Sequence, residues 1–156
     1  MELGPLGMRL FFNLYPPYFF SRTRIKYIAP DWREIVVELP KSLLTRNYVG
    51  TTFGGSLYAA TDPFFMMMLI KIFGIKDHII WDKGAHIDFK RPVRSNLIYR
   101  FIITEDELKK IQEGLKRSGK VLPEFSVDGI DKNGDVCVSI RKILYIRRKN
   151  SVGKKR

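Results

Sequence analysis

Residues 47–62 (Asn-Tyr-Val-Gly-Thr-Thr-Phe-Gly-Gly-Ser-Leu-Tyr-Ala-Ala-Thr-Asp) hold residue types that could act on a carbonyl group. Gly54 and Gly55 stand where a loop enters an apolar helix, and glycine lets another molecule approach the backbone closely. The first amides of a helix have no partner within it, so two such N–H groups can hold a developing oxyanion. A plain loop-to-helix turn with Ser56 as the cap is the alternative interpretation.

Asp62 is the second chemical feature, about two turns into the same apolar helix. A buried carboxylate without a partner is costly, so Asp62 is expected either to be paired or to line a polar cavity where it does chemistry. Because Pro63 follows, Asp62 could instead only cap a helix that restarts there, and the residue pattern alone favours this cap. Asn47 and Gly50 are by themselves typical of a turn.

The element that must position these groups is a central helix over residues 54–73. Its side chains are apolar on every face, which predicts burial on every face. The most apolar part, residues 57–73, carries Asp62, Pro63 and Lys71. Since a membrane-spanning helix needs about 20 apolar residues with few charges, we interpret this one as the core of a soluble domain that other elements wrap.

The wrapping elements are predicted from alternating apolar and polar residues. Strands are expected at residues 24–29, 34–39, 79–90, 97–103, 124–130 and 136–147. A surface helix is expected between the last two pairs of strands, since Thr104 and Glu107 form a capping box and Gly119 ends it. Asn133-Gly134 predicts a hairpin between the final strands. The most economical arrangement is an α+β fold, a curved antiparallel sheet around one long apolar helix.

The two ends of the chain carry distinct segments. Residues 1–22 are expected to form a helical arm that Pro16-Pro17 breaks into two short helices, packed on the domain or on a partner subunit. An interfacial membrane anchor with basic flanks is the alternative. Residues 148–156 are a basic tail, expected to be solvated. With no linker or repeat, residues 1–156 are interpreted as one domain.

Composition narrows the classes of function. The 156 residues are 45% hydrophobic, with 28 basic and 16 acidic residues and a net charge of +12. Such a charge attracts nucleic acid, anionic lipid or a phosphate-bearing small molecule. One cysteine, Cys137, excludes a disulfide framework and favours a reducing, cytoplasmic location. His78 and His86 have no second ligand at metal spacing, so no metal site is expected.

The residues of the central segment resemble the signature of PaaI-like hotdog-fold acyl-CoA thioesterases, including a branch of unassigned function. That signature is Asn, a gap, Gly-Thr, then His-Gly-Gly and an acidic residue seven positions later. Asn47, Gly50-Thr51, Gly54-Gly55 and Asp62 occupy those places. Residues 86–92 (His-Ile-Asp-Phe-Lys-Arg-Pro) resemble the strand of the family that ends in an aromatic residue, two variable residues and proline.

The resemblance implies a hotdog fold and hydrolysis of an acyl-CoA thioester at a dimer interface. Asp62 would be the nucleophile or general base, and the amides of Gly54 and Gly55 would polarise the carbonyl. Asn47, from the facing subunit, would position water or substrate. Homodimers, with tetramers as a further possibility, are expected, and no cofactor beyond the coenzyme A of the substrate.

Substrate contacts are expected near the same cleft. From charge and position, the candidates for the coenzyme A phosphates are Lys83, Arg91 and Arg94. Phe53, Ser56 and Asp82 are further candidates for substrate binding, with a solvated strand end as the alternative for Asp82 and Lys83.

Two positions depart from the family signature. Phe53 stands where the family has histidine, and Pro63 follows the acid, so the helix must kink or restart. These departures favour a second hypothesis, a hotdog module that binds acyl-CoA or a fatty acyl group without turnover. A third hypothesis is a basic adaptor for nucleic acid or a membrane surface. Nucleic acid is disfavoured as a partner, because the basic tail lacks aromatic residues for stacking bases, and a membrane surface is a less expected partner than acyl-CoA.

Overall fold

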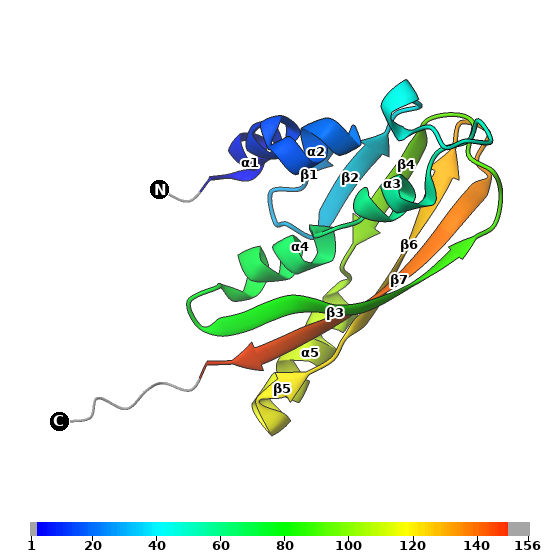
Figure 1. The fold of residues 1–156 in the computed structure, drawn as a ribbon. Coiled ribbons are helices and arrows are strands. Elements are labelled where there is room, and N and C mark those ends of the chain that lie inside the picture. The colour runs from blue at the N-terminus through cyan, green and yellow to red at the C-terminus, as the bar shows by residue number, and fades with distance from the viewer. Residues whose placement is uncertain (1–2, 150–156) are drawn as a thin grey trace.

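A seven-stranded antiparallel sheet forms the frame of the molecule, in a computed structural model that describes residues 3–149 (Figure 1). The strand order is β1-β2-β4-β6-β7-β3, and β5 pairs with β7. The strands are β1 (Arg24–Ile28), β2 (Glu34–Leu39), β3 (His78–Phe89), β4 (Leu97–Ile102), β5 (Lys120–Val121), β6 (Glu124–Asp131) and β7 (Val136–Arg148). The six predicted strands are confirmed. β5 was not predicted, since two residues are too short to show a period.

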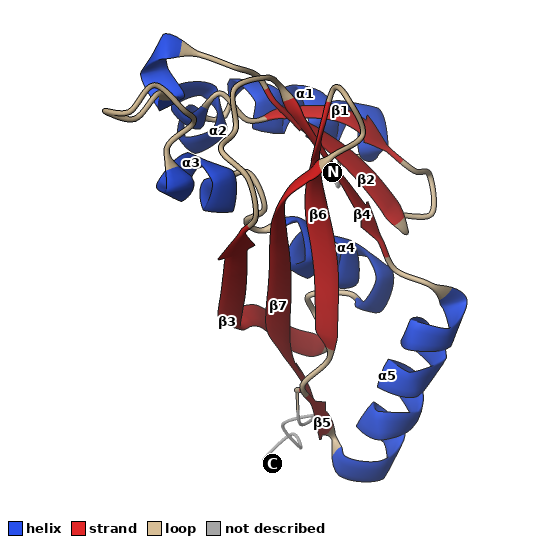
Figure 2. Cartoon of the chain, turned by 90° about the vertical axis from the view of Figure 1, so that its right-hand side faces the viewer, coloured by secondary structure: helices blue, strands red, loops and turns tan. Residues whose placement is uncertain are grey.

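The helices lie around this sheet and on its concave side (Figures 1 and 2). They are α1 (Pro5–Leu14), α2 (Pro16–Ser21), the 3-10 turn η1 (Leu43–Thr45), α3 (Gly54–Ala59), α4 (Phe64–Phe73) and α5 (Glu105–Ser118). The predicted capping box of Thr104 and Glu107 starts α5, and Gly119 ends it with a φ of 69°. Gly134, in the predicted hairpin turn, has a φ of 86°.

The arm breaks between α1 and α2 at the proline pair, as expected, and α1 covers the edge strand β1. The Asn13 side chain accepts a hydrogen bond from the Ile25 amide (2.7 Å) and donates one to the Ile25 carbonyl (3.0 Å). Because α1 occupies this edge, the arm closes one of the two ends of the sheet.

The core lies between the sheet and α4. Phe65 stacks on Phe125 of β6 at 4.8 Å between ring centroids and meets Phe101 of β4 edge-on at 5.1 Å. Phe64, Phe65, Met67, Met68 and Leu69 are the buried residues of α4. Burial of each large side chain contributes about 1.5–3 kcal/mol to the free energy of folding, and together these side chains hold α4 against the sheet.

The central helical segment, Gly54–Phe73, is not evenly buried. By length and composition it is, within residues 3–149, the one helical segment that could cross a membrane. It is interrupted at residues 60–63, between α3 and α4. Whereas α4 fills the core, α3 buries only Leu57. The prediction of burial on every face is therefore wrong for α3, whose other side chains are not enclosed by the sheet.

Candidate active site

Lys142 of β7 is a charged side chain enclosed in the core. The residue is 0% exposed and points inward with its apolar neighbours at alternate positions, Ile140 and Leu144. Its Nζ lies 3.3 Å from Asp62 Oδ1 and 3.2 Å from Asp82 Oδ2. It also donates to the Tyr58 hydroxyl at 3.4 Å and lies 5.0 Å from the centre of the Tyr58 ring. We call these four residues the Lys142 cluster.

Two carboxylates keep the buried ammonium charged. Burial by itself lowers the pKa of Lys142, but Asp82 and Asp62 outweigh it, and the net pKa lies above the usual value for lysine. A buried charge is tolerated when ion pairs and hydrogen bonds compensate its lost hydration. Lys142 is therefore a fixed positive charge on β7 that links Asp82 of β3 to Asp62, in the segment before α4.

Asp82 is the inner carboxylate of the cluster. Its side chain is 20% exposed, and β3 bulges directly after it, at Lys83, between the pairs Asp82–Leu144 and Gly84–Ile143. Burial and the neighbouring Asp62 carboxyl, against the pull of Lys142, raise the pKa of Asp82 to about 6. Burial and a like charge nearby both disfavour the ionised form of a carboxyl group, so Asp82 holds a proton more readily than an isolated aspartate.

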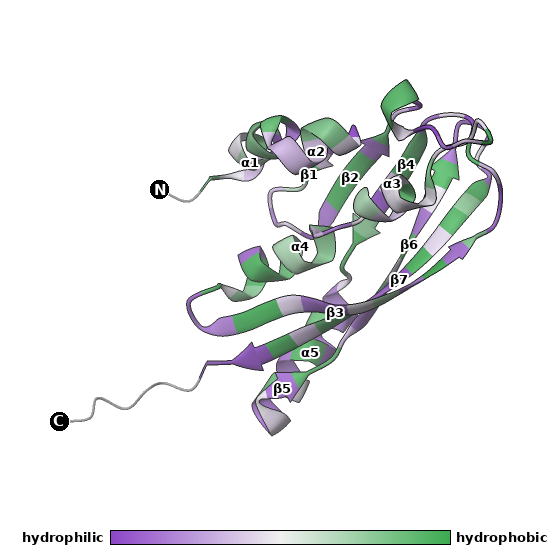
Figure 3. Ribbon diagram, in the orientation of Figure 1, coloured by the Kyte–Doolittle hydropathy of each residue, from purple (hydrophilic) through white to green (hydrophobic). Residues whose placement is uncertain are grey.

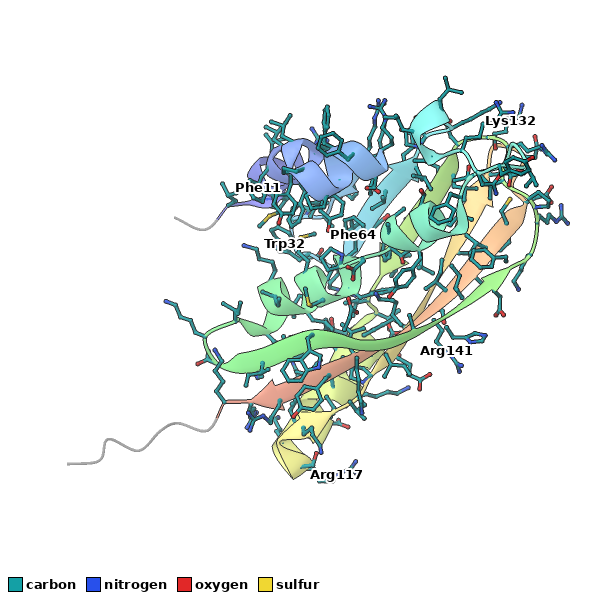
Figure 4. All side chains as sticks on the ribbon, in the orientation of Figure 1. Phe11, Trp32, Phe64, Arg117, Lys132 and Arg141 are labelled. Atoms are coloured by element: carbon teal, nitrogen blue, oxygen red, sulfur yellow. The ribbon has the colours of Figure 1, made fainter. Side chains whose placement is uncertain are left out.

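Asp62 is the outer carboxylate, with a side chain 53% exposed. Its backbone carbonyl accepts a hydrogen bond from the Tyr18 hydroxyl of α2 at 2.9 Å. Phe64, labelled in Figure 4, begins α4 just after this break, and its ring lies 5.9 Å from that of Tyr18. The carboxylate is thus anchored on one side by Lys142 and open to solvent on the other.

The cap interpretation of Asp62 is wrong. Pro63 occupies the N-cap position of α4, which has no side-chain capping bond, and the helix begins at Phe64. The other expectation, that Asp62 is paired, is confirmed by its contact with Lys142. Asp62 pairs with Lys142 because the buried ammonium of Lys142 needs a negative partner to offset its lost hydration.

The glycine pair lies at the start of α3, where Phe53 is the N-cap and Ser56 lies inside the helix. Ser56 donates its amide to the Phe53 carbonyl at 2.9 Å, so the expected Ser56 cap is wrong. Within residues 3–149, no acceptor is bonded to the Gly54 or Gly55 amide. Both glycines also have a packing role, since a Cβ on Gly54 would lie 3.1 Å from Phe89 Cζ and one on Gly55 would collide with the Phe53 ring.

A cavity of about 450 Å³ opens beside the start of α3. Of the predicted site residues, it brings together Asn47, Gly54, Arg91 and Arg94, and Lys90 also lines it. Among the described residues, its lining includes three basic side chains and no acidic one. The cavity therefore offers positive charge to a phosphate-bearing ligand.

Other predicted residues lie outside this cavity. Asp62 and Asp82 belong to the Lys142 cluster, and Lys83 is exposed at the bulge of β3. The Asn47 side chain is engaged in its own loop, where it donates to Thr51 Oγ1 (2.8 Å) and accepts from the Thr51 amide (2.9 Å). Arg91 forms a 2.7 Å ion pair with Asp135. The site residues thus fall into two groups at opposite ends of α3.

Lys142 was missed by the sequence prediction, although a signal for it exists. Residues 138, 140, 144 and 146 of β7 are apolar and buried at every second position, and Lys142 interrupts that series. A charge on the inward face of a predicted strand indicates either an error in register or a buried ion pair.

Within residues 3–149, no group of three histidine, cysteine or acidic side chains could hold a metal ion.

Comparison with known proteins places the chain in a family and a fold. Among curated proteins, none matches this sequence. The model of a family described as "Domain of unknown function (DUF4442)" matches residues 7–146.

Solved structures from bacteria share the fold across nearly the whole chain. A Pseudomonas aeruginosa protein of unknown function, described as a probable thioesterase, is 16% identical with a TM-score of 0.81, over 96% of this chain and 99% of that one. A Chlorobaculum tepidum protein of unknown function is 16% identical (TM-score 0.73, 94% and 98% covered). A Haemophilus influenzae thioesterase is 12% identical (TM-score 0.69, 95% and 93% covered). The hotdog fold predicted from the resemblance is confirmed.

Proposed function

The chain belongs to the DUF4442 family, and we propose that it hydrolyses an acyl-CoA thioester to a free acid and coenzyme A, with Asp62 as the catalytic carboxylate. The observation that carries this proposal is the half-exposed carboxylate of Asp62, held 3.3 Å from the buried ammonium of Lys142. The similar structures from P. aeruginosa and H. influenzae, described as thioesterases, support the same class of reaction.

In this reaction Asp62 acts on water or on the carbonyl carbon. As a general base, it takes a proton from water while the water oxygen bonds to the carbonyl carbon. The C–S bond then breaks, and the departing thiolate of coenzyme A takes up a proton. As a nucleophile, Asp62 would form an anhydride that water then hydrolyses. Asp82, with its pKa raised to about 6, is suited to hold the proton passed from Asp62.

The proposed site takes its glycine amides and its Asp62 from two copies of the chain. Gly54 and Gly55 begin α3, whereas Asp62 lies beyond its other end, in the break before α4. We infer that one thioester carbonyl does not contact both groups of the same chain. We place the amides of one subunit opposite the Asp62 of another, in a homodimer. The exposed edge strand β3 is the available pairing edge, since α1 covers the other end of the sheet.

The coenzyme A phosphates fit the basic cavity next to Gly54. Lys90, Arg91 and Arg94 line it, and a phosphate there would gain charge-assisted hydrogen bonds. Lys83 and Asp82 lie outside it, so their contacts with substrate require the two-copy site.

A second candidate is the hotdog module that binds an acyl-CoA without turnover. Two observations favour it: the Phe53 ring lies against Gly55, and both polar atoms of the Asn47 amide are bonded within its own loop. Neither residue is then free to orient water.

The experiment is hydrolysis of short, medium, long and aromatic acyl-CoAs by the full chain, beside Asp62→Asn. We expect turnover of one acyl class and a loss of about a hundredfold or more in the variant. Asp106→Asn, an exposed aspartate of α5, is the matched control and should retain full activity. No turnover of any substrate, with tight binding of one, would establish the binding module.

Subunit mixing tests the shared site. Asp62→Asn and Gly54→Val should each be inactive, and co-refolding them in equal amounts should restore about a quarter of the activity through mixed dimers with one complete site. If the amides and carboxylate act within one chain, mixing restores nothing.

A further inference from the structure

The outer face of the arm is apolar and uncovered in the described structure. Its exposed residues, each 50–76% accessible, are Leu6, Leu10, Phe11, Leu14, Phe19 and Phe20. The turn η1, which contacts α2, adds Leu43 and Leu44, at 82% and 74%. Figure 3 shows hydrophobic residues along α1, α2 and η1. We call these eight residues the arm patch.

This outer face is unusual for a helix that covers a sheet. Such a helix normally buries its apolar stripe and presents polar residues to water. The two polar side chains of α1 instead point to the sheet edge, where Arg9 donates to the Lys26 carbonyl at 2.9 Å and Asn13 binds Ile25. Met8, Phe12 and Tyr18 pack against the core, so the arm is fixed to the domain by polar and apolar contacts on one side. On the other side it presents leucine and phenylalanine outward.

The charge around the arm patch is positive. Residues 3–30 contain four basic residues, Arg9, Arg22, Arg24 and Lys26, and no acidic one. Lys41 and Arg46 flank η1, and the chain as a whole carries a charge of +12. An apolar surface bordered by basic side chains matches the interface of an anionic lipid bilayer, where apolar residues enter the acyl boundary and cations meet phosphates.

We propose that the arm patch docks the protein on an anionic lipid bilayer. This inference goes beyond hydrolysis and does not depend on it. Docking would also lie close to the Lys142 cluster, because Tyr18, next to Phe19 in α2, donates to the Asp62 carbonyl at 2.9 Å. A protein held there meets acyl compounds that partition into the membrane.

The test is flotation of the full chain with phosphatidylcholine vesicles, with and without about 30% phosphatidylglycerol. We expect binding to the anionic vesicles only. The double variant Leu14→Ser/Phe20→Ser should bind at least about tenfold more weakly, whereas Leu122→Ser, an exposed leucine away from the arm, should bind like the native chain.

Charge has its own matched pair of variants. Arg24→Gln/Lys26→Gln should weaken binding to anionic vesicles about thirtyfold, since each charge contributes about 1 kcal/mol near such a surface. Arg117→Gln, on α5 and labelled at the opposite end of the molecule from the arm in Figure 4, should not. The proposal is overturned if the native chain binds no anionic vesicle. It is also overturned if light scattering shows that Leu14→Ser/Phe20→Ser breaks an oligomer, because the patch would then contact a second copy.

Discussion

Two sets of ion pairs in this molecule differ in burial more than in distance. Lys142 lies 3.3 and 3.2 Å from its two carboxylates, and Arg33 Nη1 lies closer, 2.9 Å, to Glu105 Oε2. The Lys142 side chain is 1% exposed, whereas Arg33 and Glu105 are 37% and 57% exposed. Asp62 is 53% exposed but Asp82 only 20%, so water screens the Lys142 pairs less than the Arg33–Glu105 pair. The shorter contact is therefore expected to contribute less, and variants of the two sets can test this.

The largest effect is expected from Lys142→Ala. It removes the cation from two neighbouring carboxylates and leaves a cavity in the core, which should lower the free energy of unfolding by about 3–5 kcal/mol at neutral pH. Urea denaturation at pH 7 measures it. At a pH below about 4, where Asp82 is protonated and no longer pairs its charge with Lys142, the loss should be smaller. An unchanged loss at low pH would show that packing, not charge, explains the effect.

Lys142→Met separates stability from activity. Methionine fills much of the same volume, so this variant should be more stable than Lys142→Ala. Because Lys142 positions Asp62, we expect kcat to fall about 10–100-fold with little change in KM. The lower inflection of the pH–rate profile should move to higher pH, since no ammonium then favours the ionised carboxyl pair. A native pH profile in Lys142→Met would exclude this positioning role.

Asp82 predicts a pH dependence of stability. Its pKa is raised from 3.8 to about 6 in the folded protein, so the folded chain binds this proton more tightly than the unfolded chain does. The stabilising contribution of protonated Asp82 is full below about pH 4 and is lost as the pH rises through 6. Relative to Asp82→Asn, the native chain should lose on the order of 2 kcal/mol between pH 4 and pH 7. Parallel pH profiles for the two proteins would contradict this.

The sequence contained enough information for the elements but not for the cluster. Local signals sufficed for α5, whose capping box and terminal glycine are both formed, and for the strands, whose alternation marks the buried face. The contacts of Asp62 depend on the break before α4 and on the register that sets Asp82 opposite Leu144. No local pattern encodes a contact between residues 80 positions apart. The resemblance located Asp62, and the structure supplied its partner Lys142.

The smallest effect is expected from Glu105→Gln, which removes the charge of the shorter, exposed pair and keeps its shape. Glu105 also lies in the first turn of α5, where a negative charge interacts favourably with the helix dipole. Together these contributions should amount to less than about 1 kcal/mol in urea denaturation. Salt at about 1 M should remove most of this loss, because screening acts over about 3 Å there, and should leave the loss in Lys142→Ala nearly intact. Equal losses in the two variants, or equal salt sensitivity, would show that distance and not burial determines the strength of these ion pairs.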